Sequence, residues 1–435
     1  MAKLNRPILP IVTHEGATAK HINPELQLRR SVMSCLLWEN EFYEDGQSIS
    51  NRISNLIPKV DAQKVSAIAI EAREKMKLRH IPLFIVREMA KLNSHKLLVE
   101  LTLSRIIQRP DELTEFLAIY WKDGKQPLSA QVKRGLASAF GKFNEYQLAK
   151  YNRDNAIKLK DVLFLCHAKP KNLEQELLWK RLINNELVTP DTWEVSLSTG
   201  KDKKETFERL IKENRIGALA LLRNLRNMQQ SKVSDDIILE AISNIKTERV
   251  LPFRFITAAR YAPNYESQLE ISMLKCLNGM EKLGGKTVIL VDVSGSMDSS
   301  ISDKSNVLRM DAGCGLTILV RELTDCKIYS FSDNIVACPN RHGFALRDAI
   351  TNSQPHSGTY LGKAISVINT MEYDRLIVIT DEQSHDTIPN PNGKAYMINV
   401  ASNEHGVGYG KWIHVDGWSE SVLDFIRSVE QEHLS

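Results

Sequence analysis

The spacing of apolar residues changes at Gly284, and no other feature of this 435-residue chain restricts its fold as strongly. Upstream of this glycine, apolar residues recur at every third or fourth position, the spacing that lines one face of a helix. Downstream they form short runs, such as VILV at 288–291, which have the length of buried strands. We therefore predict two domains of different class, residues 1–283 and residues 284–435.

The first region reads as a series of amphipathic helices. One apolar face contains Val65, Ile68, Ala69, Ala72 and Met76. Prolines separate segments that are mostly roughly 12 to 20 residues long, and the alternation typical of strands is almost absent. Because helices of this kind must bury their apolar faces on one another, stacked helical pairs are the economical fold. The sequence shows no fixed repeat period, so a compact helical bundle remains an alternative.

The second region alternates strand-like and helix-like segments. Strands are predicted at 287–291, 327–331, 375–379, 395–400 and 412–415, and helices at 306–323, 362–369 and 420–429. Strands buried on both faces and connected through helices indicate a mostly parallel, doubly wound α/β sheet. In such sheets, ligands bind outside the carboxyl ends of the strands.

Charge divides the chain in the same way as apolar spacing. Residues 284–435 contain 12 Lys and Arg against 19 Asp and Glu, a net charge of −7. Residues 1–283 contain 45 against 34, a net charge of +11, so the overall value of +4 conceals the asymmetry. The basic half suggests an anionic partner, and the acidic half suggests a cation.

Composition excludes two broad classes of protein. With 43% hydrophobic residues, the chain can bury substantial cores, which excludes disorder as its main state. No apolar run approaches the roughly 18 residues that a membrane-spanning helix needs, and the N-terminal residues lack the apolar block of a secretory signal. The six cysteines are scattered, without a Cys-x-x-Cys pair. We therefore expect a cytoplasmic protein that does not associate with membranes.

The stretch VILVDVSGSMD carries the clearest chemistry. Asp292 falls where a hydrophobic strand ends, and Ser294 and Ser296 follow at alternate positions. Thr359 precedes a predicted helix, and Asp381 ends a second apolar strand in the way that Asp292 ends the first. Two carboxylates and three hydroxyls are hard oxygen ligands of the kind that suits Mg²⁺. A polar turn after a strand is the plainer alternative.

These five residues resemble the metal-ion-dependent adhesion site of von Willebrand factor A domains. In that family an Asp-x-Ser-x-Ser motif, a threonine and a second aspartate hold the ion, and all five positions are present here in the same order. The resemblance implies an A domain over residues 284–435 and a divalent cation, with Mg²⁺ as the expected ion.

The basic half contains three further motifs. They are KDVLFLCHAKP within 146–172, LLRNLRNM within 216–228 and LPFRFITA within 251–261. Together they resemble the TROVE domain of the Ro autoantigen family, whose members also have an A domain downstream. The resemblance implies HEAT-like helical repeats closed into a ring. It also implies binding of small noncoding Y RNAs on the outside of that ring and of single-stranded 3′ ends of misfolded RNAs in its hole.

The family pattern also suggests which residues contact RNA. It places a lysine and a histidine seventeen residues apart, and Lys150 and His167 match that spacing. The full set of candidates is Lys150, His167, Lys133, Arg134, Arg153 and Lys169. Such side chains bind phosphates and release counterions. Alternatively, His167 lies at the edge of a core beside Cys166, and the basic residues are solvated helix faces.

Unpaired bases would also need aromatic partners. Trp121, Phe143, Tyr146 and Tyr151 are candidates, although core packing explains each of them as well.

The sequence therefore favours a noncatalytic RNA-binding protein that acts in small-RNA quality control or ribonucleoprotein assembly, with no role for DNA. Motifs for catalysis are missing, since there is neither a Gly-x-Ser-x-Gly elbow nor a His-Glu-x-x-His helix. The alternative is a protein–protein adaptor, in which the cation keeps a position open for an acidic residue of an exoribonuclease or another protein. A hydrolase that uses a metal at Asp292 is a third reading.

Overall fold

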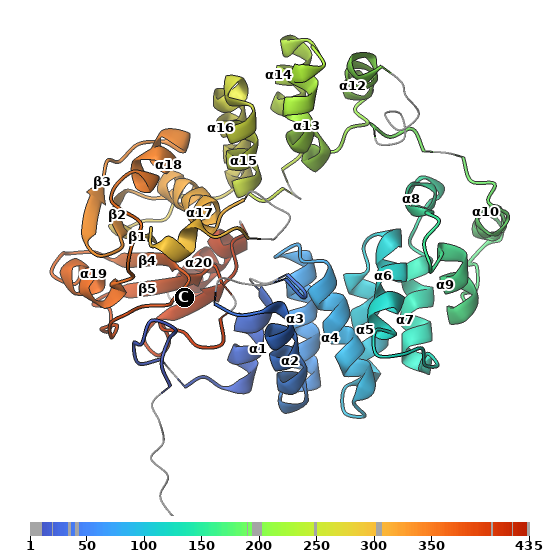
Figure 1. The fold of residues 1–435 in the computed structure, drawn as a ribbon, viewed down its shortest axis with the longest axis horizontal. Helices are drawn as coiled ribbons and strands as arrows, with labels where there is room; N and C mark the ends of the chain where they lie inside the picture. The colour runs from blue at the N-terminus through green and yellow to red at the C-terminus, as the bar shows by residue number, and fades with distance from the viewer. Residues whose placement is uncertain are drawn as a thin grey trace, which may run out of the picture. The chain divides into compact units, whose positions relative to one another are not determined.

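A computed structural model of the chain shows helical repeats and a doubly wound α/β sheet, as the sequence predicts (Figure 1). It describes residues 11–19, 21–33, 36–39, 43–188, 190–193, 202–247, 250–301, 307–401, 403–419 and 421–432. The chain forms two compact units. The helical unit comprises Leu36–Trp38 and Ser50–Asn244, and the α/β unit comprises Met1–Cys35, Glu39–Ile49 and Ile245–Ser435.

The compact units differ from the domains predicted at Gly284. An N-terminal segment and residues 245–283 pack with the strands rather than with the helical repeats. Helix α1 (Pro24–Met33) contacts strand β6, and helices α15 and α16 contact helices α17 and α18. Helix α2 (Gly46–Leu56) begins in the α/β unit and ends in the helical unit.

The helical unit consists of helix pairs stacked in two rows. Its helices are α3 (Ala62–Glu74), α4 (His80–Lys91), α5 (Lys96–Ile106), α6 (Pro110–Tyr120), α7 (Ala130–Phe140), α8 (Glu145–Tyr151), α9 (Leu159–Cys166), α10 (Leu173–Asn184), α12 (Lys203–Lys212), α13 (Ala218–Gln230) and α14 (Asp235–Ser243). One row contains α3, α5, α7 and α9, and the other contains α4, α6, α8 and α10. Stacked pairs, rather than a single compact bundle, are therefore the fold of this unit, while closure of the helices into a ring remains a prediction.

A repeat period that the sequence does not reveal emerges from the contacts between helices. Polar side chains 34 to 36 residues apart bond across successive pairs, namely Ser66 with Thr102 (2.6 Å), Arg79 with Glu115 (2.6 Å), Arg134 with Glu100 (2.6 Å) and Arg181 with Glu145 (2.7 Å). The residue types differ from pair to pair, so the period is a property of the packing and not of a repeated motif.

Helix starts follow local sequence signals. The Asp61 carboxylate caps α3 by accepting hydrogen bonds from the backbone N–H groups of residues 63 and 64, and the Asn172 side chain caps α10. Pro110 is the first residue of α6, and Pro82 lies in the first turn of α4. These prolines therefore lie at the starts of helices and not between them. The backbone N–H groups of the first turn have no partner within the helix, so proline, which lacks an N–H, removes no helical hydrogen bond there.

The α/β unit is built on a six-stranded sheet in the order β3-β2-β1-β4-β5-β6. The strands are β1 (Thr287–Asp292), β2 (Cys326–Phe331), β3 (Ile335–Cys338), β4 (Arg375–Thr380), β5 (Lys394–Asn399) and β6 (Ile413–Asp416). Only β3 is antiparallel to its neighbour in this sheet. The helices are α1, α15 (Phe253–Tyr261), α16 (Glu266–Leu274), α17 (Arg309–Leu323), α18 (Gly343–Thr351), α19 (Leu361–Ile368) and α20 (Ser421–Glu432).

Two of these elements, β3 and α18, have no counterpart among the predicted segments. The edge strand β3 has only four residues and is half-exposed, so it lacks the long apolar run by which the other strands are recognised. Two of the predicted helices begin at residues 306 and 420, which lie outside the described residues, and the described helices start at Arg309 and Ser421.

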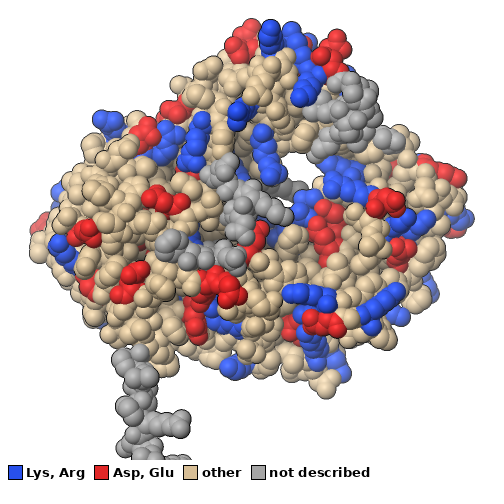
Figure 2. All heavy atoms as spheres, in the orientation of Figure 1, with Lys and Arg blue, Asp and Glu red and all other residues tan. Residues whose placement is uncertain are grey.

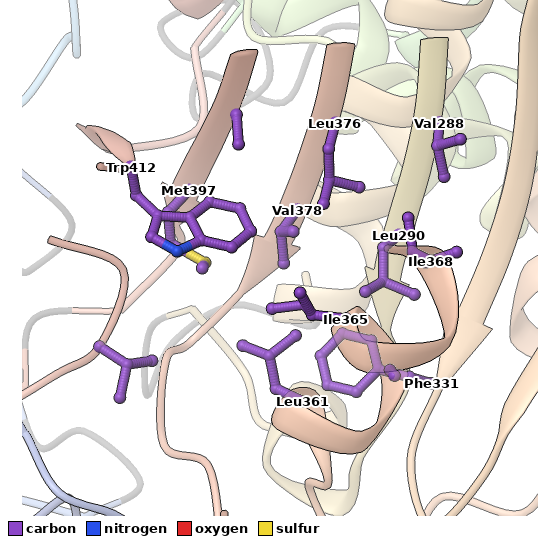
Figure 3. Close-up of a cluster of buried hydrophobic side chains, with 13 residues drawn as sticks. Val288, Leu290, Phe331, Leu361, Ile365, Ile368, Leu376, Val378, Met397 and Trp412 are labelled. Carbon is purple, nitrogen blue, oxygen red and sulfur yellow. The ribbon is translucent and has the colours of Figure 1, made fainter. Parts of the chain in front are cut away.

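Alternate residues of the strands form one layer of the core. Val288 and Leu290 of β1 lie beside Leu376 and Val378 of β4, and α19 covers them with apolar side chains that include Ile365 (Figure 3). Helix α17 packs on β1 as well. Because the chain leaves β1 toward β2 on one side and later returns to β4 on the other, the switch point of the sheet lies between β1 and β4. No described helix is long and apolar enough to cross a membrane.

Candidate cation site and basic helical surface

The two aspartates of the predicted cation site meet at the switch point of the sheet. Asp292 is the last residue of β1, and Asp381 follows Thr380, the last residue of β4. The Thr380 hydroxyl donates to Asp292 Oδ2 at 2.6 Å. Both carboxylates are fully buried. Pairing of β1 with β4 therefore brings together two side chains that are 89 residues apart in the sequence.

The turn after β1 brings the two serines to Asp292. The Ser294 N–H donates to Asp292 Oδ1 at 2.9 Å, and the Ser294 and Ser296 hydroxyls lie 3.3 Å apart. The Gly295 N–H donates to the carbonyl of Ser357, which attaches the turn to the loop that carries Thr359. All three hydroxyl residues are buried. The structure thus places the five predicted residues on three loops that meet at one edge of the sheet.

The electrostatics of this cluster favour a cation. Burial, reinforced by the negative charge of Asp381, raises the pKa of Asp292 to about 7, although hydrogen bonds from Ser294 and Thr380 oppose the shift. One compensating charge is present, since Arg309 Nη1 of α17 lies 3.5 Å from Asp381 Oδ2. Two neighbouring buried carboxylates outnumber the one guanidinium that is paired with them, so a divalent cation suits the residues that are there.

The ligand set depends on hydroxyls as much as on carboxylates. In the part of the chain that the structure describes, no three His, Cys, Asp or Glu side chains gather in an arrangement that could hold a metal ion. The site at the switch point has two carboxylates and three hydroxyls, a composition that suits a hard, hydrated ion such as Mg²⁺ better than Zn²⁺.

Tyr43 lies near the same site in the N-terminal segment, and it is not among the predicted site residues. Its hydroxyl donates to Glu15 Oε1 at 3.3 Å. Burial and the charge of Asp381 raise the pKa of Tyr43 well above its usual value. No sequence signal points to this residue, because more than 240 positions separate it from the motif after β1.

On the helical unit, His167 and Lys133 form one basic pair. His167 ends α9 in the left-handed conformation, with φ 52° and ψ 42°, and its side chain is exposed. Lys133 Nζ on α7 lies 3.5 Å from His167 Nε2. Glycine and asparagine tolerate this backbone region better than histidine does, so the position is strained. The exposure of the imidazole, rather than its backbone, argues against a core-edge role beside the buried Cys166.

Lys150 lies in the other row of helices. It is in the last turn of α8, with its Nζ 5.8 Å from the centre of the Tyr151 ring. The Arg109 guanidinium lies 4.8 Å from the same ring. Among the described residues no hydrogen bond, ion pair or ring contact joins Lys150 to His167. The two residues that the family spacing pairs therefore lie on helices of different rows.

The remaining basic candidates differ in their partners. Arg134 is paired with Glu100 at 2.6 Å, so its charge is already compensated. Arg153 and Lys169 are exposed, and no ion pair with a described residue involves either of them. On the face drawn in Figure 2, Lys and Arg side chains are interspersed with Asp and Glu. The net charge of the first half is therefore distributed among many local pairs, and the uncompensated cations are fewer than the composition suggests.

The structure also separates the aromatic candidates. Phe143 is buried, the Trp121 indole N–H donates to the Gln126 carbonyl, and Tyr151 is covered by Arg109. Tyr146 is exposed, but Phe164 on α9 is more so, at 57%, and lies one helical turn before His167. The sequence analysis does not identify Phe164, although its place inside an apolar stretch next to a basic motif is a usable signal.

Comparison with known families identifies one domain. Residues 180–282 match the family model of the TROVE domain. This range contains the LLRNLRNM and LPFRFITA motifs, whereas KDVLFLCHAKP lies upstream of it. The candidate residues on α7, α8 and α9 thus lie outside the matched range.

Two curated relatives share a short segment with this chain. Telomerase protein component 1 of Mus musculus is 33% identical over 86 residues, and that of Rattus norvegicus is 32% identical over 89 residues. The segments cover 18% and 19% of this chain. The chain spans only 3% of the length of either relative.

A solved structure resembles nearly the whole chain. The crystal structure of the Deinococcus radiodurans RO (RSR) protein matches with a TM-score of 0.58 and 15% sequence identity. The match covers 91% of this chain and 97% of that one. At this level of identity, the likeness concerns the fold.

Proposed function

We propose that this chain, which belongs to the TROVE-domain family of Ro-type proteins, is a noncatalytic RNA-binding protein. The observation that carries the proposal is a set of three side chains on α7 and α9, namely the partly exposed Lys133 beside the exposed His167, and the exposed Phe164. It combines a cation for a phosphate, an imidazole for hydrogen bonding and an aromatic face on which an unpaired base can stack. No described carboxylate pairs with any of the three.

The RNA that fits this surface has both structured and single-stranded parts. Exposed lysines at the ends of helices suit the backbone of a small folded RNA resembling a Y RNA, and Phe164 suits a base outside a duplex. Single-stranded 3′ ends of misfolded RNAs, threaded through a ring of helical repeats, are the second class of ligand. With such ligands, the protein would act in small-RNA quality control or ribonucleoprotein assembly, a role that we place in the cytoplasm.

A gel-shift titration with two RNAs tests the proposal. One RNA is a hairpin with a single-stranded 3′ tail, and the other is the same hairpin with a blunt end. We expect the affinity of both to fall with added salt, and the tailed RNA to bind more tightly. The double variant Lys133→Gln, His167→Gln should weaken binding at least about tenfold, as expected for one lost charge contact and one lost hydrogen bond.

The control removes a cation elsewhere. Lys286 precedes β1 in the α/β unit, is 70% exposed and pairs only weakly with Glu372, so Lys286→Gln makes the same change of charge away from the helices. Equal losses of RNA affinity in the control and in the double variant would show that net charge alone, and not this surface, accounts for the loss. Unchanged affinity in the double variant would rule out the proposed RNA surface.

A second function rests on the site at the switch point. The five oxygen-bearing residues would hold Mg²⁺, and a bound ion of this kind can accept a carboxylate from another molecule. We therefore also propose a metal-dependent contact with a protein partner, such as an exoribonuclease. Mg²⁺ should raise the melting temperature of the wild type and of the exposed control Asp424→Asn. It should leave that of Asp292→Asn unchanged, and a Mg²⁺ response in Asp292→Asn would contradict this assignment.

A further inference from the structure

The N-terminal segment of the chain lies against the loop that follows β4. The Thr13 hydroxyl donates to the Ser384 carbonyl at 2.7 Å, and the His14 N–H donates to Gln383 Oε1 at 2.8 Å. Ser384 and Gln383 follow Asp381 within three residues. The segment is therefore attached to the same backbone that holds the second aspartate of the cation site.

This attachment directs an acidic side chain toward the site. Glu15 Oε2 lies 2.9 Å from His385 Nε2, and the His385 ring in turn accepts a hydrogen bond from the N–H of Thr359. Glu15 Oε1 accepts the hydrogen bond from the Tyr43 hydroxyl. Since Thr359 is a proposed cation ligand, a chain of contacts runs from Tyr43 through Glu15 and His385 to the cation site.

Tyr43 itself is held from several directions. Its ring lies against the ring of His14, with centroids 4.2 Å apart. The next residue, Glu44, accepts a hydrogen bond from the Glu404 N–H at 3.0 Å. Between the two parts of the segment, Arg30 is fully buried, where it pairs with Glu382 and donates to the Asn403 carbonyl at 2.7 Å. Glu15 and Tyr43 therefore belong to the α/β unit and pack within it.

We propose that Tyr43 and Glu15 form an internal cap on the outward side of the cation site, in the place that the carboxylate of a partner would take. This inference rests on the proposed cation site. An incoming carboxylate meets the negative charge of Glu15 and must displace the Tyr43 hydroxyl that is bonded to it. External acidic ligands therefore bind only to the fraction of molecules in which the cap has moved away, and their apparent affinity is reduced by that fraction.

Terbium luminescence on the full-length protein tests the cap. Tb³⁺ substitutes for the cation, its lifetime in H₂O and D₂O counts the water molecules that it retains, and acetate serves as the external carboxylate. The variants are Tyr43→Phe, which keeps the ring contact with His14, Glu15→Gln, and the two combined. The controls are Tyr146→Phe on α8 and Glu372→Gln, whose side chain is 92% exposed at the opposite edge of the sheet.

We expect acetate to bind the combined variant about tenfold more tightly than the wild type. This factor corresponds to a cap that is open in about a tenth of the wild-type molecules. Bound Tb³⁺ should gain at least one water molecule in Tyr43→Phe, and the controls should match the wild type. Equal acetate affinity and equal hydration in all proteins would overturn the cap while leaving the cation site intact. A Tb³⁺ signal that persists in Asp292→Asn would overturn the cation site and the cap together.

Each single variant makes a conservative change of shape, so both are expected to fold. If the combined variant does not fold, the hydration in Tyr43→Phe and the acetate affinity of Glu15→Gln decide the question by themselves. Neither measurement depends on RNA, so a negative result here is distinct from a failure of the proposed RNA surface.

Discussion

The two units of this chain present their candidate functional residues in opposite ways. In the α/β unit, Asp292 and Asp381 are fully buried, fixed by strand pairing and surrounded by hydroxyls. In the helical unit, Lys133, His167 and Phe164 lie on the ends and outer faces of two helices. A cation site needs an exact cage of oxygens, whereas a phosphate surface needs only accessible charge. The residues of the cation site therefore include a short sequence motif, whereas Lys133 and His167 of the phosphate surface lie 34 residues apart on successive repeats.

Ion pairs also differ between the two units in how deeply they are buried, and therefore in how much stability is lost when one is broken. The Arg30–Glu382 pair in the α/β unit is completely buried, while the Arg134–Glu100 pair in the helical unit is about half exposed on both sides. Breaking a buried pair leaves an uncompensated charge in a medium of low dielectric constant, but breaking an exposed pair leaves charges that water can solvate. The predictions below test this contrast, beginning with the largest effect.

Arg30→Met should be the most damaging of these substitutions. It leaves the buried Glu382 without its guanidinium partner and detaches α1 from the strands, so we expect a loss of about 3–5 kcal/mol in the free energy of unfolding of the α/β unit. Hydrogen exchange of the β4 and β5 amides measures this loss. Protection that stays at the wild-type level would mean that the N-terminal segment is not part of that unit.

Stability should also fall at high pH through His414. Burial alone would lower the pKa of this residue, but the charges of Glu382 and Asp416 outweigh burial and raise it to about 9. Because the pKa of His414 is higher in the folded protein than in the unfolded chain, its protonation stabilises the folded state. This stabilisation is complete below pH 6.5, the ordinary histidine pKa, and is lost as the pH rises through 9. Between pH 7 and 10 we expect the free energy of unfolding to fall by up to about 3 kcal/mol. His414→Gln should lack this dependence, and identical pH profiles would refute it.

Phe164→Ala should separate affinity from folding. Because the ring is largely exposed, its removal costs little stability, but stacking with an unpaired base is worth about 1–3 kcal/mol. Affinity for the tailed hairpin should therefore fall, while affinity for the blunt hairpin stays close to that of the wild type. A variant that loses both equally would place Phe164 outside any single-stranded site.

His167→Gly should change stability and RNA binding in opposite directions. Glycine relieves the left-handed backbone at φ 52°, so we expect the protein to be more stable by about 1 kcal/mol. RNA affinity should decrease because the imidazole is gone. Thermal unfolding together with the gel-shift titration measures both. A destabilised variant would show that the imidazole has a structural role after all.

Arg134→Gln should have the smallest effect. Its pair with Glu100 is exposed to water, so we expect less than about 1 kcal/mol of lost stability. Since its charge is already compensated, RNA affinity should change less than in Lys133→Gln, which lies one position earlier on the same helix. A larger loss for Arg134→Gln would mean that RNA displaces Glu100.

The sequence is most informative where structure is local. The runs that end at Asp292 and Asp381 identify two buried strands, and Asp61 and Asn172 mark helix starts, because strand burial and capping depend on neighbouring residues. The edge strand β3 has no such signal. The position of Tyr43 also has none, since the charge of Asp381 that acts on it belongs to a segment far away in the sequence.

By itself, the sequence determined the two fold classes and the change between them near Gly284, and it predicted the five oxygen ligands of the proposed cation site. Periodicity and short motifs record those properties directly. Only the tertiary structure decided that the N-terminal segment packs with the sheet, that Lys150 and His167 belong to different rows of helices, and that Arg134 is already paired. Those outcomes depend on which surfaces meet after folding, because a charge is available to a ligand only where no neighbour compensates it.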